Sequence, residues 1–262
     1  MQYLYKHYRP EHPKQKYDPS LYINPSIEMQ AAIMSEDVYD PTPGEILPGG
    51  WHLSKKKIRD GMGGYLSNDD YNDPVTHLHS QLYERTNEQG KVEYAYVTRG
   101  THNMYDVRTD LVQAFASSKQ YAKSVENAIK ISKSLASEGA SLFFAGHSLG
   151  GAEAVADAKA TGRPAIVFNP AALSEASVTD LHLDRTPKIT AFIVNGEIVG
   201  SLQNVINLRR EGKLIYLPAE YSFEKNPLNP FSWIGAAILN SPRKGINHEI
   251  STVIDLMIKN GY

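Results

Sequence analysis

The segment that most constrains the fold of this chain is residues 141–152. Here the apolar run Ser-Leu-Phe-Phe-Ala leads directly into Gly-His-Ser-Leu-Gly, and an Ala-rich stretch follows. The run before the pentapeptide predicts a short buried strand, and the stretch after it predicts a helix. Strand, sharp turn and helix in this order are typical of a nucleophile elbow, in which Gly146 and Gly150 leave room for the turn that lifts the Ser148 side chain above a sheet. The pattern therefore indicates Ser148 as a candidate nucleophile.

A Gly-x-Ser-x-Gly pentapeptide is weak by itself, since composition alone yields about one match per ten chains of this length. The alternative is a Gly-rich loop whose Ser148 only caps the following helix. The context favours the elbow, because the serine would lie at a helix N-terminus whose partial positive charge stabilises a developing anion.

The rest of the chain alternates between strand and helix patterns. Residues 87–90 predict a Gly-containing turn between two alternating segments, and hence a hairpin. Residues 40–75 have the composition of a loop, and residues 1–23 that of an extended arm. Strands separated by helices predict one α/β domain over residues 1–262, with a mostly parallel sheet. The expected helices are residues 27–39 with Ser26 as N-cap, 111–136, 152–160 and 249–259; the expected strands are residues 77–85, 91–98, 141–145, 165–168, 189–194 and 214–217.

Composition excludes several classes of function. The chain has 27 Lys and Arg against 29 Asp and Glu, a formal charge of −2, which argues against nucleic-acid binding driven by net charge. The absence of Cys excludes a disulfide framework, a thiolate metal site and a Cys nucleophile. The first 25 residues contain no apolar signal core, and residues 231–239 are about half as long as a membrane span. We therefore expect a soluble protein, cytoplasmic or exported by a route independent of a signal peptide.

Three motifs together resemble the class 3 (fungal-type) lipases of the α/β-hydrolase fold: Gly-His-Ser-Leu-Gly-Gly at residues 146–151, Tyr-Val-Thr-Arg-Gly-Thr at 96–101 and Asp-Val-Arg-Thr-Asp-Leu at 106–111. The resemblance covers roughly residues 93–255, and the first 75 residues add little to it. It implies a central, mostly parallel sheet with helices on both faces, and a hydrolase for lipid esters that needs no metal or organic cofactor. It also implies that Thr101 helps to form the oxyanion hole; the alternative is that Thr101 only ends a strand.

The other candidate catalytic residues follow from the order of the triad along the chain in this fold, which is serine, acid, histidine. The second oxyanion donor would be the backbone N–H of Leu149, directly after the nucleophile. Only His182 and His248 follow Ser148. We expect His248, in a loop before the closing helix, to be the base, although it could instead cap that helix. His182 lies in a polar stretch typical of a surface.

Glu197 is the candidate acid. It follows the strand expected at residues 189–194, which resembles the family's strand that ends in an Asp, but the turn here looks one residue shorter. A Glu can orient the imidazole if its extra methylene is matched by a backbone set further back. Asp184 is the second candidate for the acid. The alternative for Glu197 is that it is an exposed turn carboxylate without a catalytic role.

Two further stretches admit two interpretations each. Residues 223–239 could form a flap that contacts lipid or a packed core helix. Four lysines on one face of the long helix could meet anionic headgroups or form an ordinary solvated face; these are Lys119, Lys123, Lys130 and Lys133.

Taken together, the sequence predicts a lipase that contacts a membrane or lipid interface transiently and binds no nucleic acid. The alternatives are a phospholipase A, for instance a secreted bacterial toxin, and a catalytically silent hydrolase fold used for binding. The presence of Ser148 and His248 argues against the silent fold.

Overall fold

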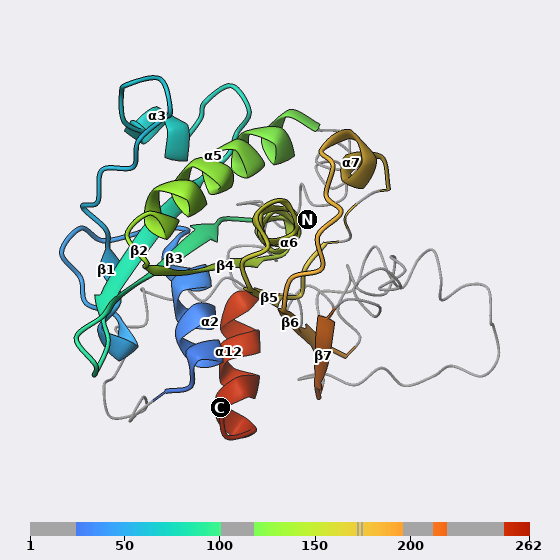
Figure 1. Ribbon diagram of the computed structural model, residues 1–262. Helices are drawn as coiled ribbons and strands as arrows, with labels where there is room; N and C mark the ends of the chain where they lie inside the picture. Colours follow the sequence, from blue (N-terminus) through green and yellow to red (C-terminus); the bar gives the residue numbers. More distant parts are fainter. Residues whose placement is uncertain (1–24, 101–117, 172, 174, 196–211, 219–248) are drawn as a thin grey trace, which may run out of the picture.

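The computed structural model describes residues 25–100, 118–171, 173, 175–195, 212–218 and 249–262. At its centre is a seven-stranded sheet whose strands lie in sequence order (Figure 1). The first three strands pair antiparallel, and β3 to β7 are parallel. The fold is that of an α/β-hydrolase, as the sequence predicted. The strands are β1 His52–Leu53, β2 Ser80–Thr86, β3 Val92–Thr98, β4 Ser141–His147, β5 Ala165–Phe168, β6 Ile189–Val194 and β7 Gly212–Leu217.

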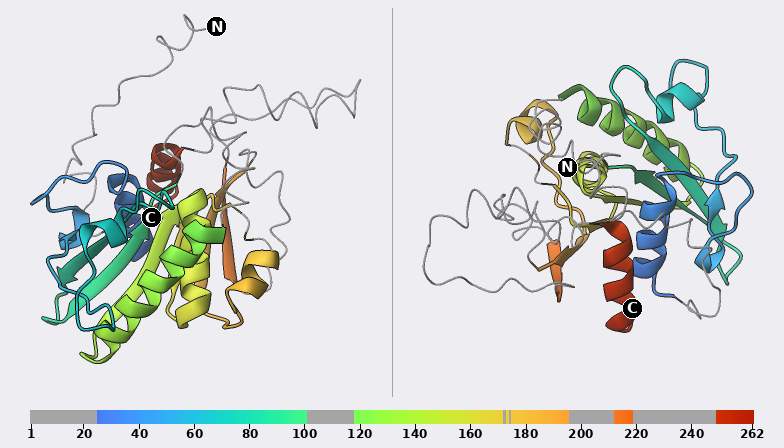
Figure 2. Two further views of the ribbon diagram at one scale, coloured as in Figure 1. Left: turned by 90° about the horizontal axis from the view of Figure 1, so that it is seen from above. Right: turned by 180° about the vertical axis from the view of Figure 1, so that it is seen from behind.

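Helices cover both faces of the sheet (Figures 1 and 2). The first layer is α2 (Ile27–Asp37) with α12 (Ile250–Lys259), and the second is α5 (Ser118–Ala136) with α6 (Leu149–Thr161). Neighbouring residues of β4 point to opposite faces, so Ala145 belongs to the core under α2 and α12 whereas Phe144 belongs to the core under α5 and α6. The parallel strands are therefore buried from both sides, which explains their apolar runs.

Most of the expected elements are confirmed, with shifted ends. Ser26 caps α2 by accepting a hydrogen bond from the Met29 amide at 3.1 Å. The predicted hairpin is β2 and β3, and β5 and β6 have the predicted bounds. Helix α6 begins at Leu149 rather than at residue 152. The expected arm at residues 1–23 and the first turns of the helix expected at 111–136 lie outside the described residues. The sequence did not predict η2 Pro48–Gly50, β1, α3 Asn68–Tyr71 and α7 Glu175–Asp180.

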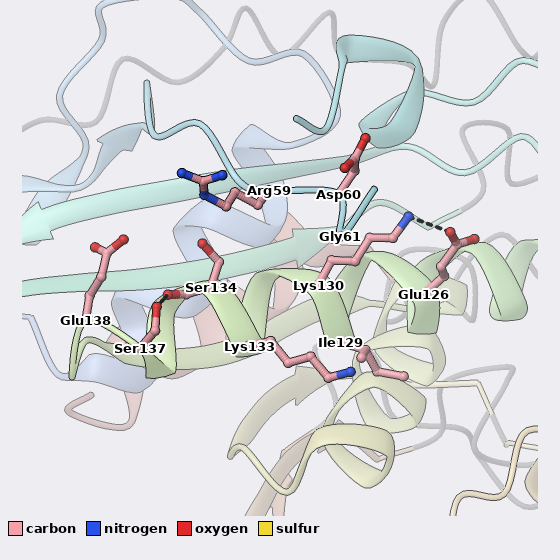
Figure 3. A pocket seen from close by; sticks show the side chains of 10 residues that line it. All are labelled: Arg59, Asp60, Gly61, Glu126, Ile129, Lys130, Lys133, Ser134, Ser137 and Glu138. Atoms are coloured by element: carbon pink, nitrogen blue, oxygen red, sulfur yellow. Dashed lines mark hydrogen bonds and ion pairs between the residues drawn. The ribbon is translucent and has the colours of Figure 1, made fainter. Parts of the chain in front are cut away.

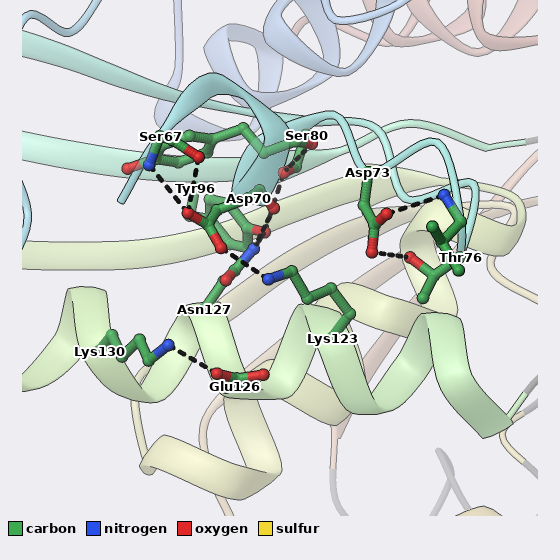
Figure 4. A network of polar contacts seen from close by, with 12 residues as sticks. Ser67, Asp70, Asp73, Thr76, Ser80, Tyr96, Lys123, Glu126, Asn127 and Lys130 are labelled. Atoms are coloured by element: carbon green, nitrogen blue, oxygen red, sulfur yellow. Dashed lines mark hydrogen bonds and ion pairs between the residues drawn. The ribbon is translucent and has the colours of Figure 1, made fainter. Parts of the chain in front are cut away.

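A polar network fastens α3 to α5 (Figure 4). Lys123 Nζ donates to Asp70 Oδ1 at 2.6 Å, and Asn127 Nδ2 donates to the backbone carbonyl of Asp70 at 2.6 Å. The Tyr96 hydroxyl donates to Ser80 Oγ at 2.9 Å and extends the network to the hairpin. One of the four lysines considered for headgroup binding is thus engaged inside the molecule.

The carboxyl ends of the parallel strands meet at one edge of the sheet, which is where α/β folds place their sites. Ser148 follows β4 directly at this edge. Among the described residues, no helix has both the length and the apolar character needed to cross a membrane.

Candidate active site

The backbone of Ser148 has the geometry of a nucleophile elbow. Its φ is 58° and its ψ is −124°, between the last residue of β4 and the first of α6. L-residues rarely adopt this conformation, because it costs about 1–3 kcal/mol, and it persists only where the surrounding structure enforces it. A strained serine on a sharp strand-to-helix turn is typical of a nucleophile elbow. Ser148 itself is only 5% exposed.

The glycines of the motif are required by close backbone packing. A Cβ on Gly146 would collide with the carbonyl of Gly150, and a Cβ on Gly150 would collide with the carbonyl of Thr98. These neighbours are main-chain atoms, which cannot rotate away as a flexible side chain can. Helix α6 therefore starts directly against β3 and β4, and only Gly fits at both positions.

The end of β5 holds the elbow from the other side. The Ser148 amide donates to the Phe168 carbonyl at 3.0 Å, and the Ser148 carbonyl accepts from the Ala171 amide at 2.9 Å. Between them, Asn169 (φ 41°) accepts a hydrogen bond on its side-chain oxygen from the Val194 amide at 2.8 Å. The Ser148 side chain makes no capping hydrogen bond to α6, so the helix-cap interpretation is not supported.

The end of β3 lies against the nucleophile. A Cβ on Gly100 would lie 3.2 Å from Ser148 Cβ and 2.7 Å from the His147 carbonyl oxygen. Thr101, the expected oxyanion residue, is next in the chain and lies outside the described residues. Leu149, the other expected donor, is the first residue of α6, where backbone amides have no acceptor within the helix.

Glu197 and His248 also lie outside the described residues. The described chain resumes at Glu249, which is close enough to the Tyr39 hydroxyl to raise its pKa. Asp184 is exposed, and its neighbour Arg185 lies 3.6 Å from where a Cβ on Gly162 would be. Gly162 ends α6, about 20 Å along the helix axis from Ser148. His182 is exposed, as expected.

Tyr39 is a residue near the site whose role the sequence did not reveal. Its hydroxyl lies 3.1 Å from Nδ1 of His147, the residue before the nucleophile. Burial is the main reason that the pKa of Tyr39 is raised well above its ordinary value. The two residues are 108 positions apart, so no local pattern could pair them.

Two buried acids on α6 were also not anticipated. Glu153 and Asp157 are both fully buried between α6 and α5. Burial, followed by the negative charge of Asp157, raises the pKa of Glu153 well above its ordinary value, while Gln120 and Arg99 act in the opposite direction. The Ser124 hydroxyl donates to Asp157 at 2.9 Å, but burial still raises the pKa of Asp157. Within the part of the chain that the structure describes, no three His, Cys, Asp or Glu residues could jointly hold a metal ion.

A cavity of about 520 Å³ lies between residues 59–61 and the C-terminal half of α5 (Figure 3). Because α5 ends just before β4 begins, this cavity is at the edge of the sheet opposite Ser148 and is not part of the candidate site. On its wall, Lys130 pairs with Glu126 at 2.6 Å, so a second lysine of the considered basic face is neutralised. Its lining residues are Arg59, Asp60, Gly61, Glu126, Ile129, Lys130, Lys133, Ser134, Ser137 and Glu138.

Comparison with solved structures gives only distant likenesses. The native Rhizomucor miehei lipase propeptide complex is 10% identical, with a TM-score of 0.46 over 72% of this chain and 67% of that one. A deletion mutant of the same complex is 10% identical, with a TM-score of 0.44 over 73% and 66%. A Pyrobaculum calidifontis esterase is 10% identical, with a TM-score of 0.33 over 96% and 97%. Comparison with curated proteins gives no match.

A family model gives a specific match. The model of the Tle-like phospholipase domain, described as phospholipase-like, matches residues 30–221. The match begins in α2, so Tyr39 lies within the matched domain. The match supports a lipase-like hydrolase, but the family is not the class 3 lipases that the sequence motifs resemble. This chain belongs to the Tle-like phospholipase domain family, a family of phospholipase-like hydrolases.

Proposed function

We propose that this chain hydrolyses carboxylic esters of phospholipids through an acyl-enzyme on Ser148. The observation that carries the proposal is the strained backbone of Ser148 in the turn between β4 and α6. The phospholipid substrate is supported by the family, and the acyl-serine chemistry is supported by the elbow together with the motifs that resemble those of class 3 lipases.

In the proposed mechanism, Ser148 Oγ attacks the ester carbonyl carbon while His248 accepts the serine proton. The carbon–oxygen bond to the alcohol then breaks, and His248 returns the proton to the leaving alcohol oxygen. A water molecule, deprotonated by His248, attacks the acyl-enzyme, releases the fatty acid and restores Ser148. Glu197 keeps the imidazole in its productive tautomer and stabilises the imidazolium.

The oxyanion of each tetrahedral intermediate is bound by the Leu149 amide and by Thr101 in this proposal. Two features support it: Leu149 is at the positive end of α6, and Gly100, directly before Thr101, lies against Ser148. Asp184 is less suitable than Glu197 as the acid, because Arg185 lies against the end of α6 remote from Ser148.

The proposal is tested with Ser148→Ala and with Ser137→Ala, an exposed serine on the opposite edge of the molecule, as the control. We expect Ser148→Ala to lower turnover of a soluble nitrophenyl ester by about 10⁴-fold or more and to abolish labelling by a fluorophosphonate. Ser137→Ala should behave as the wild type. Labelling of another residue, or near-normal turnover by Ser148→Ala, would contradict the assignment.

The substrate class is tested by mass spectrometry on phospholipid vesicles. Cleavage of a carboxylic ester releases a fatty acid and a lysophospholipid. Release of diacylglycerol or phosphatidic acid would instead indicate cleavage at the phosphate, which this proposal excludes.

A further inference from the structure

We propose that Tyr39 is a positioning residue that sets the nucleophile elbow at a fixed distance from the end of β3, which carries the oxyanion residue. This inference rests on the proposed function, because it assigns a task within the same site. The proposed triad and oxyanion hole do not include Tyr39, which comes from the layer of helices under the sheet.

The Tyr39 hydroxyl lies where three segments of the site meet. It is 3.1 Å from His147 Nδ1 and packs against Gly100, where a Cβ would lie 2.6 Å from the hydroxyl oxygen. The carboxylate of Glu249 is near enough to raise the pKa of the phenol. Each of these residues is the chain neighbour of one proposed functional residue: Ser148, Thr101 and His248 respectively. One hydroxyl thus contacts or faces all three segments.

Tyr39 is protonated in this contact. Burial raises the pKa of Tyr39 and Glu249 raises it further, so the hydroxyl keeps its proton at neutral pH. The phenol can donate this proton to His147 Nδ1 when His147 carries its own proton on Nε2, and it can accept from Nδ1 when the proton is there instead. In both tautomers the hydroxyl links Tyr39 to the residue before the nucleophile.

Gly100 is tightly packed against both Tyr39 and the elbow. The point where its Cβ would be lies 2.6 Å from the Tyr39 hydroxyl oxygen, 2.7 Å from the His147 carbonyl oxygen and 3.2 Å from Ser148 Cβ. Tyr39 is held mainly by α2: its backbone amide donates to the Glu36 carbonyl at the end of this helix, and its ring packs against the core between α2, α12 and the sheet. Tyr39 therefore acts as a spacer between the end of β3 and the elbow, anchored on a helix that belongs to neither.

The spacer matters because oxyanion stabilisation depends on sub-ångström geometry. A displacement of about 1 Å between reacting groups can cost on the order of 100-fold in rate. The donors must fit the oxyanion of the transition state, whereas ground-state binding of the ester does not depend on them to the same degree. Loss of the spacer should thus reduce kcat and leave KM nearly unchanged.

The test is Tyr39→Phe, which removes only the hydroxyl. On a soluble nitrophenyl ester we expect kcat to fall by about 10- to 100-fold with KM within about twofold of the wild type. An alkyl boronic acid, which forms a tetrahedral adduct with the serine, should bind more weakly by a similar factor. A purely structural role of Tyr39 would not produce this selective loss.

The matched control is Tyr83→Phe. Tyr83 is fully buried in the same core, and its hydroxyl donates to Asp37 Oδ2 at 2.7 Å, away from the elbow. Its loss should lower the thermal midpoint at least as much as Tyr39→Phe does, and should leave kcat and boronic acid affinity unchanged.

A second pair of variants keeps the inference testable if Tyr39→Phe folds poorly. His147→Asn retains a polar group near the Nδ1 position that can accept from Tyr39, whereas His147→Leu removes it. We expect His147→Leu to reproduce the loss in kcat, and His147→Asn to recover most of it. Adding Tyr39→Phe to His147→Leu should cost little more, because both changes remove the same contact.

Wild-type kcat in Tyr39→Phe, or equal losses in His147→Leu and His147→Asn, would overturn the inference while leaving the proposed function intact. Absence of ester hydrolysis and of Ser148 labelling in the wild-type chain would instead overturn the proposed function, and the inference with it.

Discussion

At the scale of single residues, the most unusual feature is the pair of acids buried on α6. Both side chains are fully buried, and among the described residues no group meets hydrogen-bond geometry with a carboxyl oxygen of Glu153, although Gln120 lies close enough to lower its pKa. A carboxylate in such a place is strongly disfavoured unless it is paired, so a buried acid remains protonated to a higher pH than usual. The stability of the protein should therefore depend on pH through Glu153 and Asp157.

We expect the free energy of unfolding to fall as pH rises. Because the folded-state pKa of Glu153 is raised, its contribution is complete below its unfolded pKa of about 4 and is lost as pH rises through the folded value. Above about pH 4 the wild type loses the Glu153 proton when it unfolds, and this favours the unfolded state. Glu153→Gln has no such proton, so it should be more stable than the wild type at pH 8, but not at pH 4. Urea unfolding at both pH values measures the difference. The exposed Glu126→Gln should show no such gain, and a Glu153→Gln variant that parallels the wild type at both pH values would refute the expectation.

The acid of the proposed triad is also decided at the scale of one residue. Glu197→Gln should lower turnover by about 10⁴-fold, because the amide cannot hold the imidazole in its productive tautomer. Asp184→Asn should be close to the wild type, since Asp184 is exposed and its neighbour Arg185 packs at the far end of α6. Steady-state kinetics on a nitrophenyl ester separate the two. If only Asp184→Asn is impaired, the alignment of the strand that precedes Glu197 is wrong.

At the scale of elements, the capping of α3 and its attachment to α5 both depend on the carboxylate of Asp70. Asp70 accepts from the amide and the hydroxyl of Ser67, the N-cap of α3, and pairs with Lys123 on α5. Burial raises the pKa of Asp70, but these hydrogen bonds outweigh it and lower the pKa to about 2. The short helix is therefore held to α5 by charge-assisted contacts (Figure 4).

Asp70→Asn should lower the free energy of unfolding by about 1 kcal/mol at pH 7, a modest value because the ion pair is partly exposed. Since the pKa of Asp70 is depressed, its contribution is present above about pH 4 and is lost as pH falls toward 2. The difference between wild type and variant should shrink over this range in urea titrations. Asp69→Asn, in the same helix, is the control, and an equal effect of both changes would contradict the role of Asp70.

At the scale of the whole molecule, the two ends of the described chain pack together. Helix α12 lies beside α2 under the sheet (Figures 1 and 2). Val253 and Met257 of α12 are fully buried in the core that the two helices share. Residues more than 200 positions apart thus share one core, which favours a single cooperative unit. The prediction of one domain over residues 1–262 has a direct test in unfolding.

Met257→Ala should lower the free energy of unfolding by about 2–4 kcal/mol, because it leaves a cavity between α12 and α2. The adjacent Ile258 is 36% exposed, and Ile258→Ala should cost much less. Unfolding in urea, followed by circular dichroism and by Trp fluorescence, should show one transition at the same midpoint. Two transitions would indicate separate domains.

Sequence alone determined the features that depend on near neighbours in the chain. The apolar runs of β5 and β6, the hairpin of β2 and β3 and the turn at Ser148 follow from period, turn chemistry and the sterics of glycine. The start of α6 was placed three residues late, because apolar periodicity does not detect Gly150 and Gly151 packed against the sheet.

Only the tertiary structure decided which distant side chains meet. Tyr39 reaches His147 across 108 residues, and Lys123 reaches Asp70 across 53. Glu153 reads as an ordinary polar residue of an Ala-rich helix until α5 covers it. A local pattern records which face of an element is apolar, but the contacts of a polar atom depend on how the layers pack, and that packing is set by the whole chain at once.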